Sequence, residues 1–204
     1  MVVQKIQERL KTEGFEALLL TGLENPAAKK NLEYVTGYTG SFGFAIVGET
    51  YKYFVSDFRY RDQIAIEVPD FTFVEITATF LDTLKEIVQK EGIQSLGFDK
   101  RIRYSEYELY QQLGCELIPL EGFMESFRIS KTDNEIQLMK KACEITDQAL
   151  ADILQVIKVG MTERSIEIKL KNRMIELGAD HTWDRFIVAS GARGAMPHGM
   201  ASDK

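Results

Sequence analysis

The chain has 204 residues, of which 45% are hydrophobic and 27% charged, with four prolines and no biased stretch. This composition is typical of an ordinary globular protein, and the length suits one large or two small domains. The formal charge is −6, with 14 Lys and Arg against 20 Asp and Glu in residues 1–130 and 11 against 11 in residues 131–204. No basic face stands out, so the sequence argues against a nucleic-acid partner.

The cysteines and the lengths of the apolar runs indicate the cellular compartment in which the protein is expected. Cys115 and Cys143 are far apart and have no Cys or His nearby, which argues against a disulfide framework or a thiolate metal site. The segment Met1–Lys5 turns polar too early for a signal peptide. The longest apolar runs, residues 17–20 and 42–47, are far shorter than the ~20 residues of a membrane-spanning helix. We therefore expect reduced thiols and a cytoplasmic protein without a membrane partner.

Strand and helix patterns alternate in the first part of the chain. Val3, Ile6 and Leu10 recur at helical spacing before Gly14, and Asn25-Pro26 suits a helix start. The later predicted elements are a strand at 17–20, a helix from 26 that fades before 37, strands at 42–47 and 51–55, a helix at 59–67, a strand at 71–76, a helix at 80–90, a strand at 95–98, a helix at 105–112 and a strand at 115–118. The strands at 42–47 and 51–55 read as a hairpin, so the pattern predicts an α/β fold with a mixed sheet.

The pattern changes near residue 130, where Thr132 and Glu135 form a capping box that starts a long helix. Thr162 caps a second helix, which Gly178 ends. The predicted apolar faces of these helices are Ile136, Met139, Cys143, Leu150, Ile153 and Ile157 in the first and Ile166, Leu170, Met174 and Leu177 in the second. We therefore predict two domains, residues 1–128 and 129–204.

The segment Trp183–Ala189 reads as the single strand of the second domain. A lone strand leaves its backbone N–H and C=O groups unpaired. We therefore expect a downstream segment or another chain to pair with Phe186–Ala189, and we expect the second domain to be incomplete.

Six sequence blocks together resemble the Xaa-Pro aminopeptidases and Xaa-Pro dipeptidases of the creatinase/pita-bread superfamily. They follow the order found in that family and extend over essentially the whole chain. The blocks are residues 31–41 (NLEYVTGYTGS), 56–63 (SDFRYRDQ), 127–136 (FRISKTDNEI), 160–163 (GMTE), 186–191 (FIVASG) and 197–203 (PHGMASD). The resemblance implies a creatinase-like N-terminal domain followed by the first part of a pita-bread α+β domain.

The resemblance also bears on metals. Members of this family hold two divalent metals, Mn, Co or Zn, with two Asp, one His and two Glu that lie beyond the Pro-His-Gly block. It therefore implies that none of these ligands is present here and that this chain by itself has no metal site. The residues agree, because Ser190–Lys204 offers one His and one Asp, His198 and Asp203, while a dinuclear centre needs several bridging carboxylates. Earlier acids, namely Glu135, Asp147, Asp152 and Glu167, read as solvated helix faces.

His198 is the one residue onto which a catalytic role of the family carries. The matching His of the family lies beside the metals and hydrogen-bonds the substrate or the developing tetrahedral oxyanion, a task that suits an imidazole. Without the family match, a loop histidine satisfied by backbone would be the favoured interpretation. In this chain alone, His198 would have no metal-bound hydroxide to assist.

Other polar and aromatic residues suggest structural roles. Asp57 and Arg59 are spaced for a local ion pair, and His181 reads as a surface position. In relatives the first domain packs near the partner subunit's active site. Tyr38 and Arg59 are therefore secondary candidates for substrate contact, after His198. The aromatic residues predicted to pack in the core or between domains are Phe123, Phe127, Trp183 and Phe186.

Three functions remain open. The first is a proline-specific metal-dependent exopeptidase, a homodimer acting on Xaa-Pro peptides, of which this chain is a fragment inactive alone. The second is a non-enzymatic binding or dimerisation module of the same superfamily, using the free edge at 186–189. The third is a creatinase-like amidinohydrolase, which keeps the role of His198 as acid and base.

Overall fold

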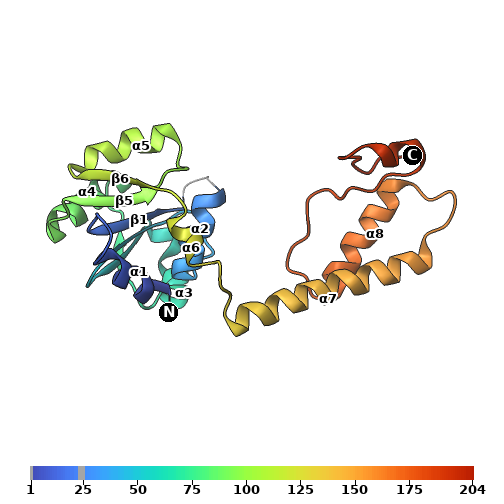
Figure 1. Cartoon of the computed structure of the whole chain (residues 1–204), viewed down its shortest axis with the longest axis horizontal. Helices are drawn as coiled ribbons and strands as arrows, with labels where there is room; N and C mark the ends of the chain where they lie inside the picture. The colour runs from blue at the N-terminus through green and yellow to red at the C-terminus, as the bar shows by residue number, and fades with distance from the viewer. Residues whose placement is uncertain (1, 23–25) are drawn as a thin grey trace. The chain divides into compact units, whose positions relative to one another are not determined.

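The computed structural model describes residues 2–22 and 26–204, and these fall into two compact units, Met1–Ile129 and Ser130–Lys204. The first unit carries the sheet and the second is built of helices and loops (Figure 1). Among the described helices, none is long and apolar enough to cross a bilayer.

The described part of the first unit folds as one six-stranded sheet with helices on its faces. The strand order is β4-β3-β2-β1-β5-β6. Neighbours β1, β2 and β3 pair antiparallel, whereas β1–β5, β3–β4 and β5–β6 pair parallel. The elements are α1 (Val2–Leu10), β1 (Ala17–Thr21), α2 (Pro26–Thr36), β2 (Phe44–Gly48), β3 (Lys52–Ser56), η1 (Phe58–Tyr60), α3 (Arg61–Glu67), β4 (Thr72–Glu75), α4 (Phe80–Glu91), β5 (Ser95–Asp99), α5 (Tyr104–Tyr110), η2 (Gln111–Leu113), β6 (Glu116–Leu120) and α6 (Phe123–Ser126).

The predicted mixed α/β sheet is therefore confirmed, including the hairpin of β2 and β3. The short helix α6 was not predicted, and the strands and helices differ from their predicted bounds by only a few residues. Of the predicted helix start Asn25-Pro26, Asn25 lies outside the described residues, while Pro26 begins α2.

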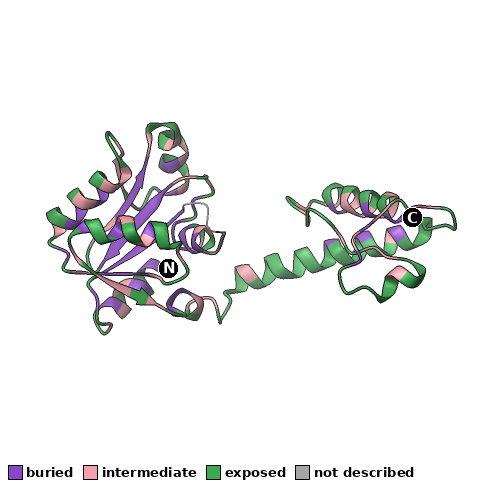
Figure 2. Cartoon of the chain, turned by 90° about the horizontal axis from the view of Figure 1, so that it is seen from above, coloured by how far each residue is buried: buried purple, intermediate pink, exposed green. Residues whose placement is uncertain are grey.

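Each face of the sheet buries its own cluster of apolar side chains. Successive side chains of a strand point to opposite faces, so Leu18 and Leu20 of β1 join one cluster while Ala17 and Leu19 join the other. Helices α1, α2, α3 and α6 cover the first face, and α4 and α5 cover the second. Figure 2 shows buried residues along the strands and exposed ones on the outer sides of the helices. Strands buried on both faces explain why β1 and β2 are continuous apolar runs.

The second unit has two main helices, α7 (Asp133–Val156) and α8 (Glu163–Glu176), followed by loops and the short η3 (Gly191–Ala195). The predicted capping box is present: Glu135 N donates to Thr132 Oγ1 at 3.3 Å, and Thr132 N donates to Glu135 Oε2 at 2.7 Å. Thr162 caps α8 as expected, since its hydroxyl accepts from Ser165 N.

The predicted apolar face of α7 is largely wrong. The buried residues of this helix are Ile145, Ala149 and Ile153, four residues apart. Only Ile153 belongs to the predicted set, of which Ile136, Met139, Cys143, Leu150 and Ile157 are exposed. The core of this unit is correspondingly small: Ile145, Ala149 and Met174 are buried, with Leu170, Leu177, Ala179 and Phe186 packed against them. Spacing alone did not select the stripe that α8 contacts, because apolar residues lie on more than one side of α7.

The predicted strand at 183–189 is also wrong. In the described residues this segment makes one isolated antiparallel bridge, between Ile187 and Met200. Two backbone N–H groups of this part of the chain bind carboxylates instead, because Phe186 N donates to Glu167 Oε1 and Ser190 N donates to Glu163 Oε1, each at 2.7 Å. The expected pairing of residues 186–189 with a downstream segment or another chain stays a prediction. Trp183, predicted to be packed, is 80% exposed.

Candidate functional site

His198 lies on an exposed turn near the C-terminus. Gly199 N donates to Met196 O at 3.2 Å, and Met200 N donates to His198 O at 2.8 Å. These bonds fix the backbone of the turn on both sides of the imidazole. The exposed side chain is therefore available to a group that approaches from outside.

Gly199, next to His198, is buried and fits only without a side chain. A Cβ atom at this position would lie 2.8 Å from the Cβ of Ala189 and 3.2 Å from the carbonyl oxygen of Arg193. The turn therefore sits directly against the segment that precedes it. This close approach explains the glycine of the Pro-His-Gly block in local terms.

Glu163, the first residue of α8, is the centre of the polar contacts around this loop. Its carboxylate is 2% exposed and accepts five hydrogen bonds. Oε1 accepts from the backbone N–H and the hydroxyl of Ser190, at 2.7 and 3.0 Å. Oε2 accepts from the backbone N–H and the hydroxyl of Ser202, at 3.2 and 2.6 Å, and from Arg193 Nε at 3.1 Å.

These donors lower the pKa of Glu163 to about 2. The largest cause is the hydrogen bond from the Ser202 hydroxyl, followed by burial, which opposes it, and then by the bonds from Ser190 and the Ser202 backbone. Hydrogen bonds to the charged form of a carboxyl favour that form. Glu163 is therefore a carboxylate throughout the neutral range.

Glu163 and Glu167 are the residues that sequence reasoning missed. Glu167 was predicted to be solvated, but it is 4% exposed, accepts from Phe186 N and forms an ion pair with Lys171 at 3.2 Å. A signal was present: residues 163, 167, 170 and 174 recur at steps of four, three and four, which places both glutamates on the same helix face as Leu170 and Met174. A carboxylate on the inner face of a helix needs partners, and here the following loop supplies them.

The residues present do not fit a two-metal centre. Within residues 2–22 and 26–204, no group of three or more His, Cys, Asp or Glu could hold a metal ion. Asp203 pairs with Arg164 at 2.7 Å, and the oxygens of Glu163 are already surrounded by five donors. A bridging site needs carboxylates with free lone pairs.

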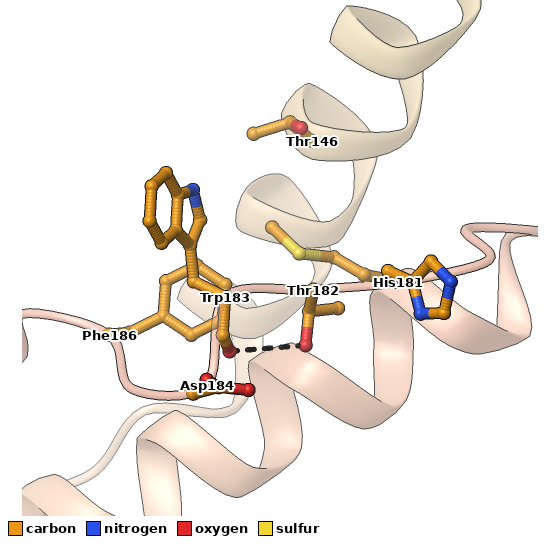
Figure 3. A pocket seen from close by; sticks show the side chains of 7 residues that line it. Thr146, His181, Thr182, Trp183, Asp184 and Phe186 are labelled. Carbon is orange, nitrogen blue, oxygen red and sulfur yellow. Dashed lines mark hydrogen bonds between the residues drawn. The ribbon is translucent and has the colours of Figure 1, made fainter. Parts of the chain in front are cut away.

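A pocket of about 550 Å³ lies elsewhere in the second unit (Figure 3). Thr182 Oγ1 donates to the backbone oxygen of Trp183 at 3.3 Å within it. Its lining is Thr146 of α7, Met174 of α8 and the loop residues His181, Thr182, Trp183, Asp184 and Phe186. His181 is exposed, as predicted for a surface position. His198 does not line this pocket, so the pocket and the candidate catalytic residue are separate features.

The candidates in the first unit have structural roles. The predicted pair of Asp57 and Arg59 is present, with Arg59 Nη2 at 2.8 Å from Asp57 Oδ2, and the Arg59 hydrogen bond lowers the pKa of Asp57. Tyr38 is buried, and its hydroxyl donates to Phe42 O at 3.0 Å, so it does not present a surface to a ligand in this structure. Phe123 is buried and Phe127 packs against the same cluster, as expected for core residues.

Residues 3–130 match the family described as Creatinase/Prolidase N-terminal domain, and residues 137–204 match Metallopeptidase family M24. An uncharacterized peptidase YqhT of Bacillus subtilis is 33% identical over 100% of this chain and 57% of its own. An Xaa-Pro dipeptidase from Bacillus anthracis has a TM-score of 0.89 at 32% identity, covering 99% of this chain and 56% of its own. An X-Pro aminopeptidase from Thermotoga maritima has a TM-score of 0.86 at 32% identity, and the match covers 98% of this chain and 56% of the aminopeptidase.

The chain thus spans little more than half the length of these relatives. The family matches nevertheless extend through both structural units, and they occur in the order that the sequence blocks predict. The chain belongs to the creatinase/prolidase family, with the start of a Metallopeptidase family M24 domain after its N-terminal domain.

Proposed function

We propose that this chain supplies the first domain and the His198 turn of a proline-specific peptidase, which hydrolyses the bond between a residue and a following proline. The observation that carries the proposal is the likeness of both units, over almost the whole chain, to a solved Xaa-Pro dipeptidase. The bond before proline has a tertiary nitrogen and no N–H. A peptidase for this bond therefore needs a site shaped for it rather than a general peptide groove.

The role proposed for His198 follows from its position and its chemistry. An exposed imidazole on a fixed turn is able to donate a hydrogen bond to the carbonyl oxygen of the bond to be cleaved. This hydrogen bond strengthens as negative charge develops on the carbonyl oxygen. Among the described residues no cluster of His, Cys, Asp or Glu could hold a metal ion that activates water, so the proposed role of His198 is to assist the reaction.

We propose further that the 204-residue chain by itself holds no pair of divalent metals and cleaves no Xaa-Pro peptide. The donor set supports this, because the acids near His198 are already bound to Arg164 or enclosed by serine and arginine donors. We also propose a cytoplasmic homodimer for the whole protein, by likeness to the family; light scattering on the eluted protein checks the oligomeric state.

The test has two arms. In the first, the purified chain is mixed with Mn²⁺, Co²⁺ or Zn²⁺ and an Xaa-Pro dipeptide, and release of the residue before proline is measured. Metal-stimulated release would contradict the proposed incompetence of this chain.

In the second arm, residues 1–204 replace the matching part of the Bacillus anthracis relative. The graft is expected to cleave Xaa-Pro peptides, with a rate loss of about 100-fold or more on His198→Ala, as for removal of one oxyanion donor. The matched control is His181→Ala, which changes the other exposed histidine of the chain and is expected to leave the rate unchanged. A folded graft that cleaves peptide bonds without preference for proline would refute the proposal.

A further inference from the structure

The carboxylate of Glu163 joins the two ends of the loop that carries His198. Ser190 begins this loop and Ser202 lies two residues before its last residue, and both donate a backbone N–H and a hydroxyl hydrogen to Glu163. The helix end adds two further bonds, because Arg164 N donates to Ser202 O at 2.9 Å and Glu163 N donates to Lys204 O at 2.8 Å. Residues 190–204, named here the His198 loop, are therefore attached to the start of α8 at both ends.

Arg193 extends these hydrogen bonds from Glu163 toward His198. Its Nε donates to Glu163 Oε2 at 3.1 Å, and its Nη2 donates to the carbonyl oxygen of Met200 at 2.7 Å. Met200 is two residues from His198, and its N–H donates to the carbonyl oxygen of His198. A continuous series of hydrogen bonds thus runs from the carboxylate to the backbone of the histidine.

We propose that Glu163 is the positioning residue for His198: it closes the His198 loop onto α8 and so sets the place of the imidazole. This inference rests on the proposed function for its meaning in catalysis, but the positioning is a property of the 204-residue chain. The side chain must end in a carboxylate, because each of its two oxygens faces a group that can only donate. Ser190 N lies on Oε1, and Ser202 N and Arg193 Nε lie on Oε2. A glutamine of the same shape would turn an NH₂ group toward some of these donors and leave them without an acceptor.

Glu167 offers a matched control on the next turn of α8. It is also buried and also accepts from a loop N–H, but its loop partner is Phe186, which precedes the His198 loop. If burial of any glutamate on this helix face were enough, Glu163→Gln and Glu167→Gln would disturb the His198 loop equally. The contacts predict that only the first substitution does so.

The experiment uses the chain as it is. It contains only two histidines, His181 and His198, so the wild type gives one imidazole Cε1–H NMR signal for each, and each variant is compared with these two signals. Glu163→Gln is expected to shift the His198 signal toward the random-coil position, leave the His181 signal in place, and speed amide exchange in residues 190–204 by about tenfold or more. Glu167→Gln is expected to leave His198 unchanged, and Glu163→Asp, which keeps the charge, is expected to restore part of the protection.

An unchanged His198 signal and unchanged exchange in a folded Glu163→Gln protein would overturn the proposal. If that variant does not fold, Ser202→Ala decides. It removes the 2.6 Å hydroxyl bond to Glu163 and the 3.4 Å bond from Lys204 N, keeps the other four bonds of the carboxylate, and is expected to give the same shift in smaller measure. No shift in Ser202→Ala would then refute the positioning role. These readouts do not involve peptidase activity, so failure of the proposed function would leave them standing, and their failure would leave the graft experiment standing.

Discussion

In the first unit the two faces of one sheet each bury a cluster of apolar side chains, while the second unit has a small cluster of Ile145, Ala149 and Met174 between its two helices. The loops of the second unit are instead attached through buried carboxylates on α8. Apolar burial contributes stability in proportion to area. A hydrogen bond contributes only about 1 kcal/mol net, but it is directional and fixes a group in place.

We therefore attribute most of the stability of the chain to the first unit. The buried carboxylates of the second unit instead hold its loops, including the His198 loop, in position. The small core of the second unit also leaves large apolar side chains in contact with solvent. Those at least half exposed are Leu138, Met139, Leu150, Leu154, Val159, Ile168, Ile175, Trp183, Ile187 and Met196.

The largest effect is expected from truncating the core of the first unit. Phe54 of β3 is fully buried, with its ring 4.7 Å from that of Tyr38. Phe54→Ala is expected to lower the free energy of unfolding by about 3–5 kcal/mol. Met174→Ala, the matched truncation in the small core of α7 and α8, is expected to cost about 2 kcal/mol, because its surroundings are more open. Urea unfolding of both variants gives the two values, and equal losses would contradict the comparison.

A second effect is expected at alkaline pH and only in the first unit, because all eight tyrosines of the chain precede residue 111. Burial raises the pKa of Tyr38 and of Tyr51 from 10.0 to about 12. The neutral form is the one that the fold favours, so this contribution to stability is complete below pH 10 and is lost as the pH rises through 12.

Absorbance of tyrosinate against pH, followed together with circular dichroism, measures this effect. We expect part of the ionisation to coincide with loss of structure between pH 10 and 12, and we expect Tyr51→Phe to move that loss to higher pH. Ionisation of all tyrosines near pH 10 with the fold intact would show that these burial effects are absent.

A smaller effect is expected from adding one methyl group to β5. A Cβ at Gly97 would lie 2.6 Å from the ring of Phe15 and 2.9 Å from Leu120. Gly97→Ala is therefore expected to cost about 1–3 kcal/mol through overpacking. Gly14→Ala is the control, because nothing lies within 4 Å of a Cβ there. Thermal unfolding compares them, and a Gly97→Ala protein as stable as the control would show that this face is loosely packed.

The sequence was informative where the chain is buried on both sides. Continuous apolar runs and turn residues predicted β1, β2 and β3 nearly to the residue, because Ala17–Thr21 and Phe44–Gly48 are buried along their whole length. The caps Thr132 and Thr162 were equally local signals.

The second unit was less predictable because its contacts are polar and distant in sequence. Glu163 meets Ser202, which lies 39 residues away, and no local pattern shows that pairing. The segment 183–189 has the composition of a strand, but Phe186 N binds Glu167, and Ser190 N directly after the segment binds Glu163. The Pro-His-Gly block was enough to select His198 as the candidate residue. It did not show which contacts hold the backbone around His198 in place.

Native-state hydrogen exchange tests most directly the claim that the first unit supplies the stability and the second the positioning. Amides of β1 and β2 report the core of the sheet, and amides in the middle of α8 report the small core of the second unit. We predict that the most protected amides of β1 and β2 exchange at least about 30-fold more slowly than those of α8, a difference of about 2 kcal/mol. Equal protection in the two units would contradict the account.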